Sequence, residues 1–199
     1  MLNKNSEYVK KYLKKIQDCS SYFIEQNYDD LEEHIMPWGT TDGKEWTCKV
    51  IKTTSAEVFL KKFYNNCIKE LVFDENILSI SIHNLPPKSS LMPHIDPITH
   101  QKNVWRLLLP LKTTDYFLKR SGIITKLEVG KTYAIDHTYE THSSWNNSET
   151  EYFSVLLFDI FYEDKSNYDL NLLKKEKTSV KHIDHYMSQT TLRSLAPTN

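Results

Sequence analysis

Two triplets in the sequence place a histidine and an aspartate two positions apart, a spacing that suits a shared metal ion. His94 and Asp96 form the first triplet, and His182 and Asp184 form the second. In a β-strand, residues two apart point to the same side, so both side chains of such a triplet reach one ion. A further histidine from another strand completes one face of an octahedron and leaves three positions for other ligands. This 2-His-1-carboxylate pattern is typical of non-haem Fe(II) oxygenases.

The two triplets differ in whether a third metal ligand can follow them in the sequence. The second lies in a polar C-terminal stretch, where only His185 follows and no strand is predicted. We therefore interpret that copy as part of a solvated surface. After the first triplet, His137 and His142 are the candidates for the distal ligand.

The composition limits the class of protein. The chain has 199 residues, which fits one domain, and its 25 Lys and Arg nearly balance 26 Asp and Glu. This balance gives no global basic field for nucleic acid. No apolar run is long enough to cross a bilayer, and the Lys-rich N-terminus lacks the apolar core of a secretory signal. We expect a cytoplasmic protein with no membrane partner, in which Cys19, Cys48 and Cys67 are buried free thiols.

The apolar periodicity changes from helical to extended after the first third of the chain. Helical spacing runs from residue 7 to about 36, and a capping-box pattern at 54–57 begins a second helix. A loop and a short strand are expected between them, at 37–47. Glycine-containing turn signals at 121–122 and 129–130 separate later strands. Strand patterns cover residues 77–86, 104–111, 123–127, 131–135 and 153–162.

Short strands that follow helices predict an α+β domain that is mainly β. We expect a jelly-roll barrel buttressed by N-terminal helices. Residues 1–75 are predicted to form the helical buttress and 76–163 the catalytic core. Residues 164–199 are predicted to add a peripheral helix and a loose tail to the same domain. The oligomeric state is left open.

The order of motifs after the first triplet resembles that of a known enzyme family. Residues 105–111 read WRLLLPL, 127–136 read LEVGKTYAID and 142–148 read HSSWNNS, before a run that ends at 158–159. This series resembles the aspartyl/asparaginyl β-hydroxylase family of Fe(II)/2-oxoglutarate oxygenases, and also the related prolyl-hydroxylase-like enzymes. The resemblance covers about residues 77–162. It implies a double-stranded β-helix, the cupin-like form of the jelly roll.

The resemblance also implies a role for each residue of the triad. His94 matches the proximal histidine of the family, and His142 matches the distal one. His142 is preferred over His137 because it stands before Trp145 in the family's order. Asp96 supplies the carboxylate that some members lack, which favours iron binding and hydroxylation instead of halogenation. The same departure weakens an inference that the substrate is an Asp or Asn side chain.

A 2-oxoglutarate enzyme also needs a base for the C5 carboxylate, because a buried carboxylate without a cationic partner is costly. The family's usual arginine, about ten residues after the distal histidine, is missing, since residues 149–154 contain no base. Arg106 is our first prediction for this anchor, with a structural ion pair as the alternative. Lys112 is the second. Tyr152 and Ser154 are predicted to add neutral hydrogen bonds.

The implied activity is hydroxylation of an unactivated C–H bond in an amino acid or a peptidyl residue, with release of succinate and CO2. The implied cofactors are Fe(II), 2-oxoglutarate and O2. One alternative is a cupin-like protein that binds a metal or a small ligand, and another is a cupin oxygenase independent of 2-oxoglutarate. The expected partner is a small amino acid or a peptide or protein substrate. Loops at 37–46, 89–93 and 137–141 are candidate rims of its pocket.

Overall fold

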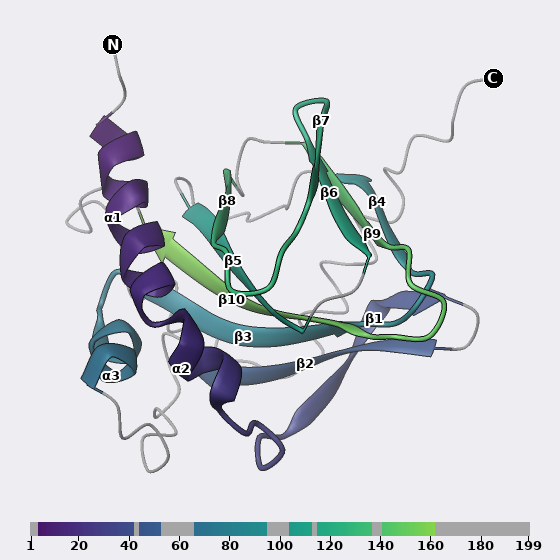
Figure 1. Cartoon of the computed structure of the whole chain (residues 1–199), viewed down its shortest axis with the longest axis horizontal. Coiled ribbons are helices and arrows are strands. Elements are labelled where there is room, and N and C mark those ends of the chain that lie inside the picture. Colours follow the sequence, from purple (N-terminus) through teal and green to yellow (C-terminus); the bar gives the residue numbers. More distant parts are fainter. Residues whose placement is uncertain are drawn as a thin grey trace.

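The structure of the protein is a computed structural model that describes residues 4–41, 44–52, 66–94, 104–112, 115–136 and 141–161. Within these residues, ten strands form two antiparallel sheets and three helices lie to one side (Figure 1). Of the described helices, none is long and apolar enough to span a membrane.

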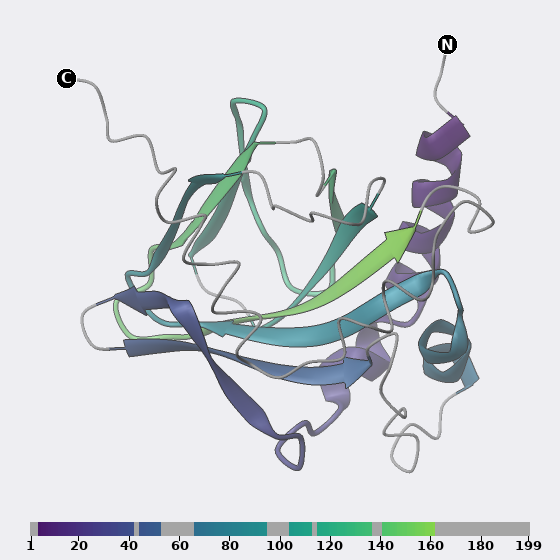
Figure 2. The ribbon, with the colours of Figure 1, turned by 180° about the vertical axis from the view of Figure 1, so that it is seen from behind.

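The two sheets differ in size. The larger sheet has the order β1 (Glu33–Thr41), β2 (Lys44–Lys52), β3 (Ile77–Leu85), β10 (Phe153–Phe161), β5 (Val104–Lys112) and β8 (Tyr133–Asp136). The smaller sheet has the order β4 (Ser90–His94), β9 (His142–Asn146), β6 (Tyr116–Arg120) and β7 (Ile123–Lys126). Figure 2 shows the larger sheet from behind, with the long strands β2, β3 and β10 side by side.

The pairing of the strands from β3 to β10 is nested. β3 pairs with β10, β4 with β9, β5 with β8, and β6 with β7. The first strand of the eight therefore pairs with the last, and each later pair closes inside the one before. This is the topology of a double-stranded β-helix, or jelly roll. The predicted fold class is confirmed.

The first third of the chain is less helical than the sequence pattern predicts. The prediction of helix through residue 36 is wrong for its last residues, because β1 begins at Glu33. The β1–β2 hairpin extends the larger sheet beyond β3, so residues 33–52 belong to the sheet instead of the buttress. In β2, Trp46 and Cys48 are buried with a period of two, which suits a strand paired with β3. The predicted start of the second helix and the predicted C-terminal helix and tail lie outside the described residues.

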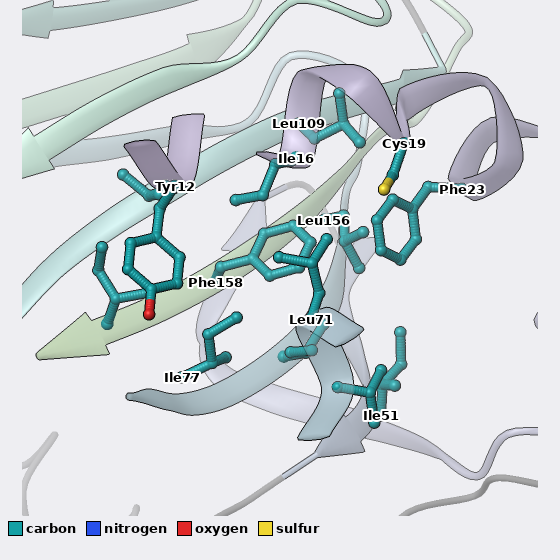
Figure 3. Close-up of a cluster of buried hydrophobic side chains, with 14 of the residues drawn as sticks. Tyr12, Ile16, Cys19, Phe23, Ile51, Leu71, Ile77, Leu109, Leu156 and Phe158 are labelled. Carbon is teal, nitrogen blue, oxygen red and sulfur yellow. The ribbon is translucent and has the colours of Figure 1, made fainter. Parts of the chain in front are cut away.

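Helices α1 (Lys4–Asp18) and α2 (Ser20–Glu25) cover one face of the larger sheet. Their buried side chains recur every three or four residues, as expected for an amphipathic stripe. These are Val9, Tyr12, Ile16, Cys19 and Phe23. The stripe packs on residues such as Leu109, Leu156 and Phe158 of β5 and β10, a cluster that we call the outer core (Figure 3).

The other face of the larger sheet packs against the smaller sheet. We call this second cluster the inner core; it includes Leu108, Tyr116, Leu118, Phe153 and Val155. Neighbouring residues of β5 divide between the two clusters, because Leu108 lies in the inner core whereas Leu107 and Leu109 lie in the outer core. Cluster membership therefore shows which face of a strand each side chain occupies.

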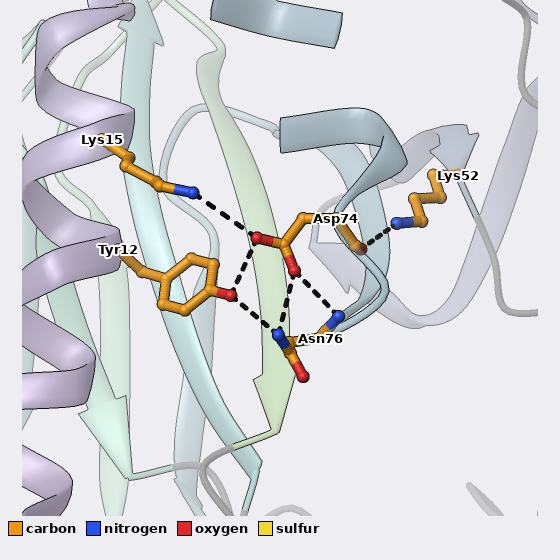
Figure 4. A network of polar contacts seen from close by, with 5 residues as sticks. All are labelled: Tyr12, Lys15, Lys52, Asp74 and Asn76. Atoms are coloured by element: carbon orange, nitrogen blue, oxygen red, sulfur yellow. Dashed lines mark hydrogen bonds and ion pairs between the residues drawn. The ribbon is translucent and has the colours of Figure 1, made fainter. Parts of the chain in front are cut away.

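A polar network joins α1 to the turn after α3 (Asn66–Phe73), as Figure 4 shows. The Tyr12 hydroxyl donates to Oδ2 of Asp74 at 2.8 Å, and the backbone N–H of Asn76 donates to Oδ1 at 2.9 Å. Lys15 lies 3.6 Å from the same carboxylate. Lys52 donates to the Asp74 carbonyl at 2.6 Å. One carboxylate thus anchors the helical cover to the start of β3.

The cysteines depart in part from the prediction. Cys48 is a free and buried thiol, whereas Cys19 takes part in a disulfide. The prediction of free thiols is therefore wrong for Cys19, because tertiary packing and not spacing along the chain decides which cysteines meet. Disulfides are uncommon in reducing compartments, so this bond does not favour the predicted cytoplasmic location.

Candidate metal centre

His94 and His142 lie side by side in the smaller sheet. They are direct cross-strand partners at the end of β4 and the start of β9. Their ring centroids are 4.4 Å apart, and the ring planes are inclined by 52°. The structure therefore brings together two side chains that the sequence separates by nearly fifty residues.

A one-residue bulge in β4 gives His94 this orientation. Leu91 pairs with Ser144 and packs on the inner core, and His94 pairs with His142. Between these two pairs, β4 contains one residue more than β9. In an unbroken strand, a side chain three residues after Leu91 would point to the opposite face. The extra residue restores the inward direction, which is a common use of bulges near functional sites. Pro93 suits this place, because β4 is an edge strand and proline has no N–H to donate.

The spacing of the two rings fits a shared octahedral ion. With metal–nitrogen bonds of about 2.1 Å and adjacent ligands at right angles, two imidazole centroids lie about 4.5 Å apart. The separation in the structure is 4.4 Å. The centroid separation therefore agrees with that of two adjacent ligands of one octahedral ion.

A hydrogen bond sets the tautomer of His94. Its Nδ1 lies 2.6 Å from the carbonyl oxygen of Met92. A carbonyl only accepts, so Nδ1 carries the proton and donates it. In the neutral ring the lone pair is then on Nε2, which is the tautomer of a metal-binding histidine whose other nitrogen is held by a carbonyl.

The histidines lie on the inner face of the smaller sheet. Ser144, two residues from His142 on the same face, accepts a 2.6 Å hydrogen bond from the Tyr116 hydroxyl. The Tyr116 ring stacks on Phe153 with centroids 3.7 Å apart, deep in the inner core. His142 itself is only 7% exposed. The candidate metal centre therefore lies on the inner face of the smaller sheet, which packs against the larger sheet through the inner core.

Two other predicted ligands lie outside the described residues. Asp96 and the alternative distal ligand His137 are among them. Within the described part of the chain, no group of three His, Cys, Asp or Glu side chains is arranged for a metal. The structure thus places two members of the predicted triad together, and the role of Asp96 stays a prediction.

Arg106, the first predicted anchor, is held by a carboxylate. It lies on the inner face of β5, two residues before Leu108, and its Nε and Nη2 donate to Asp159 at 2.8 and 3.0 Å. Ser79 donates to the same carboxylate at 2.8 Å. This is the structural ion pair that the sequence left as the alternative. The anchor role of Arg106 stays a prediction.

The other predicted anchors lie away from the histidines. Ser154 is on the outer face of β10, where its hydroxyl donates to Asn84 at 2.6 Å. Lys112 pairs with Ser154, and both line a groove of about 460 Å³ that is also lined by the end of α2. Tyr152 precedes β10 and is 40% exposed. The structure does not bring these three side chains to the candidate metal centre.

Arg120 is a basic residue beside the histidines that the sequence reasoning missed. It ends β6 and is the direct cross-strand partner of His142. Its Nη1 donates to the carbonyl of Ala134 in β8. The alternation of Tyr116, Leu118 and Arg120 before a Ser-Gly turn was the available signal for a strand with an inward arginine at its end.

Comparisons with known proteins identify no family for this chain. No family model matches the sequence, and no curated protein matches it. Among solved structures, a predicted oxalate decarboxylase from Thermotoga maritima is 12% identical, with a TM-score of 0.48 over 68% of this chain and 96% of that one. KdgF from Halomonas sp. is 11% identical, with a TM-score of 0.43 over 70% of this chain and 95% of that one. A cupin superfamily protein from Desulfitobacterium hafniense is 12% identical, with a TM-score of 0.33 over 42% and 66% of the two chains.

Identities and TM-scores this low carry no argument. The nested strand pairing of the chain itself defines the class, a double-stranded β-helix protein. On the inner face of its smaller sheet this protein carries a histidine pair with metal-ligand spacing.

Proposed function

We propose that the protein is an Fe(II)- and 2-oxoglutarate-dependent dioxygenase that hydroxylates an unactivated C–H bond of an amino acid or a peptidyl residue. The observation that supports it most is the His94–His142 pair, with centroids 4.4 Å apart on the inner face of a jelly roll. The carbonyl of Met92 supports it further, because it fixes the ligand tautomer of His94.

In this proposal, His94, His142 and Asp96 hold the metal. When bound, Fe(II) together with 2-oxoglutarate and O2 supplies the oxidant, and the balanced reaction gives hydroxylated product, succinate and CO2. One oxygen atom of O2 enters the product and the other enters succinate. Three protein ligands leave three positions for the cosubstrates, as this chemistry needs.

The chain's own task is to position these groups and to exclude water. The two strands that carry the histidines pack against the inner core, in which Phe153 and Tyr116 are 1% and 4% exposed. Burial raises the pKa of the Tyr116 hydroxyl far above its usual range, so the group stays protonated and donates to Ser144. A neutral, hydrogen-bonded pair on the same face as the histidines suits a site where a reactive oxidant must meet only its substrate.

The first test is metal binding by the anaerobic protein. His94→Ala and His142→Ala each remove a direct ligand, so we expect losses in Fe(II) affinity larger than the 10–100-fold typical of losing an outer partner of a ligand. His34→Ala, on β1 and in no metal-ligating group with His94 and His142 among the described residues, is the matched control and should bind Fe(II) like the wild type. Unchanged affinity in both ligand variants would refute the site.

The second test separates the proposal from its alternative. A charge-transfer absorption band after adding 2-oxoglutarate to the Fe(II) protein, followed by succinate formation with O2, would support the dioxygenase. The missing base at residues 149–154 favours the alternative, a cupin-like protein that binds a metal or small ligand, or an oxygenase without 2-oxoglutarate. Tight Fe(II) binding with no such band and no succinate would favour that alternative.

A further inference from the structure

We infer that the groove beside α2 is a second binding site, which takes a small zwitterion of the amino-acid class, either a free amino acid or a short peptide. This groove of about 460 Å³, lined by Lys112, Ser154 and the end of α2, is called the outer-face groove. Ile82 and Leu111 also line it, and both belong to the outer core, so it lies on the helical side of the larger sheet. The candidate metal centre lies on the inner face of the smaller sheet, and the inference does not depend on the proposed function.

One side of the outer-face groove is a row of polar side chains that crosses the larger sheet. Thr47 of β2, Asn84 of β3, Ser154 of β10 and Lys112 of β5 are successive cross-strand partners. The Ser154 hydroxyl donates to Oδ1 of Asn84 at 2.6 Å, and Nδ2 of Asn84 donates to Oγ1 of Thr47 at 3.3 Å. The last three residues of the row line the groove. A few placed polar groups beside apolar side chains are typical of ligand pockets, which commonly measure about 300–1,000 Å³.

The segment after α2 forms another side of the groove and is held in place by hydrogen bonds. The Tyr28 hydroxyl donates to the Phe23 carbonyl at 2.7 Å. The Tyr28 carbonyl accepts from Nζ of Lys49 at 3.1 Å and from the N–H of Leu31 at 3.1 Å. The Tyr28 side chain also packs against the outer core. The groove is therefore largely formed before a ligand arrives, which lowers the entropic cost of binding.

Four charged side chains around the groove determine the class of ligand. Lys49 and Lys112 come from the sheet, and Glu25 and Asp29 come from the end of α2 and the segment after it. Among the residues that the structure describes, no side-chain hydrogen bond or ion pair engages Glu25, Asp29 or Lys112. The two positive and two negative charges cancel. A simple anion would be attracted by the lysines and repelled by the carboxylates, whereas a zwitterion gains from both.

These groups also orient the ligand. Its carboxylate binds at Lys49 and Lys112, and its ammonium group binds at Glu25 and Asp29. The Ser154 hydroxyl gives its proton to Asn84, so it contacts a ligand as an acceptor and suits a peptide N–H or the ammonium group.

The test compares three peptides that differ only in the charges at their ends. Gly-Leu-Gly has both charges, N-acetyl-Gly-Leu-Gly lacks the ammonium group, and Gly-Leu-Gly amide lacks the carboxylate. The central leucine suits the apolar side chains of Ile82 and Leu111. Dissociation constants are measured on the metal-free protein by calorimetry. The wild type should bind the unmodified peptide about 5- to 10-fold more tightly than either capped form, because each cap removes a charge-assisted contact at a partly exposed site.

One substitution locates the carboxylate contact. Lys112→Gln should weaken Gly-Leu-Gly about 5-fold and leave Gly-Leu-Gly amide nearly unchanged. Lys119→Gln is the matched control, because Lys119 is exposed like Lys112 but lies on β6 and does not line the groove. It should change neither constant. Leucine, measured in parallel, distinguishes the two sources: a free amino acid is enough if leucine binds as tightly as the peptide, and a longer chain is needed if it binds more weakly.

Three results would overturn the inference. The first is a wild-type protein that binds neither leucine nor Gly-Leu-Gly, and the second is equal binding of the three peptides; both are seen without any variant. The third is a preference for the unmodified peptide that Lys112→Gln leaves unchanged. His94→Ala should keep the wild-type affinity for Gly-Leu-Gly, since loss of binding there would assign the peptide to the candidate metal centre. Fe(II) affinity is measured separately, so failure of this inference leaves the proposed function standing, and the reverse also holds.

Discussion

The Arg106–Asp159 pair allows a stability experiment that also tests the role of Arg106. We replace Arg106 with Met, Asp159 with Leu, and then both. The pair is bidentate, at 2.8 and 3.0 Å, and the two side chains are 23% and 18% exposed. Removing one member of a fully buried pair costs about 3–5 kcal/mol, whereas an exposed pair is worth about 0–1 kcal/mol.

Because the pair is partly exposed, we expect the free-energy cost of each single variant to lie between these limits. We expect Arg106→Met to lower the free energy of unfolding by about 2 kcal/mol, because Asp159 loses a bidentate, charged partner while it remains largely buried. For a domain of this size, that loss lowers Tm by about 4–8 °C. The double variant should recover most of it, since replacing a buried pair by apolar side chains is often neutral.

Urea unfolding and calorimetry measure these changes, with Lys10→Met as the control. Lys10 pairs with Glu7 at 2.8 Å, but the two side chains are 66% and 77% exposed, so its loss should cost less than about 1 kcal/mol. A double variant that loses the sum of both single losses would refute the reasoning. The Fe(II) form of the double variant also tests the predicted anchor role of Arg106, because weaker 2-oxoglutarate binding would support that role and unchanged binding would refute it.

Two further predictions concern titratable groups. Burial alone raises the pKa of Asp74, but hydrogen bonds from Asn76 and Tyr12 outweigh it and lower the pKa below its usual value. The ionised Asp74 carboxylate therefore stabilises the fold above about pH 4, and this contribution is lost as the pH falls further. In urea titrations, the difference in free energy of unfolding between wild type and Asp74→Asn should become smaller from pH 7 to pH 3. Burial, with the charge of Glu33, raises the pKa of the Cys48 thiol to about 11. At pH 8 about one thiol in a thousand is then ionised, so mass mapping should find Cys48 unlabelled by alkylating reagents until urea is added, and rapid native labelling would contradict this.

The strands that the sequence predicts best are those buried on both faces. In β5, Leu107, Leu108 and Leu109 are all buried, because one face meets the helices and the other meets the smaller sheet. Two buried faces produce a continuous apolar run, which is easy to recognise as a strand. The same holds for β3 and β10, and these strands are enough to indicate the jelly roll.

The strands that carry the candidate site are harder to recognise. Strands β4, β6 and β9 have five residues each, and their inner faces hold polar groups such as His142, Ser144 and Arg120. These side chains interrupt the alternation of apolar residues that identifies a strand. The residues that give a site its chemistry therefore weaken the pattern that would locate it, which explains why the sequence suggested Arg106 on a well-marked strand and missed Arg120.

The bulge in β4 has two consequences that the spacing of residues along the sequence does not show. Because β4 contains one extra residue between Leu91 and His94, the imidazole of His94 points toward His142. The same irregular segment brings the Met92 carbonyl within 2.6 Å of Nδ1, so the feature that orients the ring also fixes its tautomer. A regular edge strand would point the Leu91 and His94 side chains to opposite faces, and only one of them would face the inner core. The candidate metal centre therefore depends on an irregularity of the backbone as much as on the two histidines that it aligns.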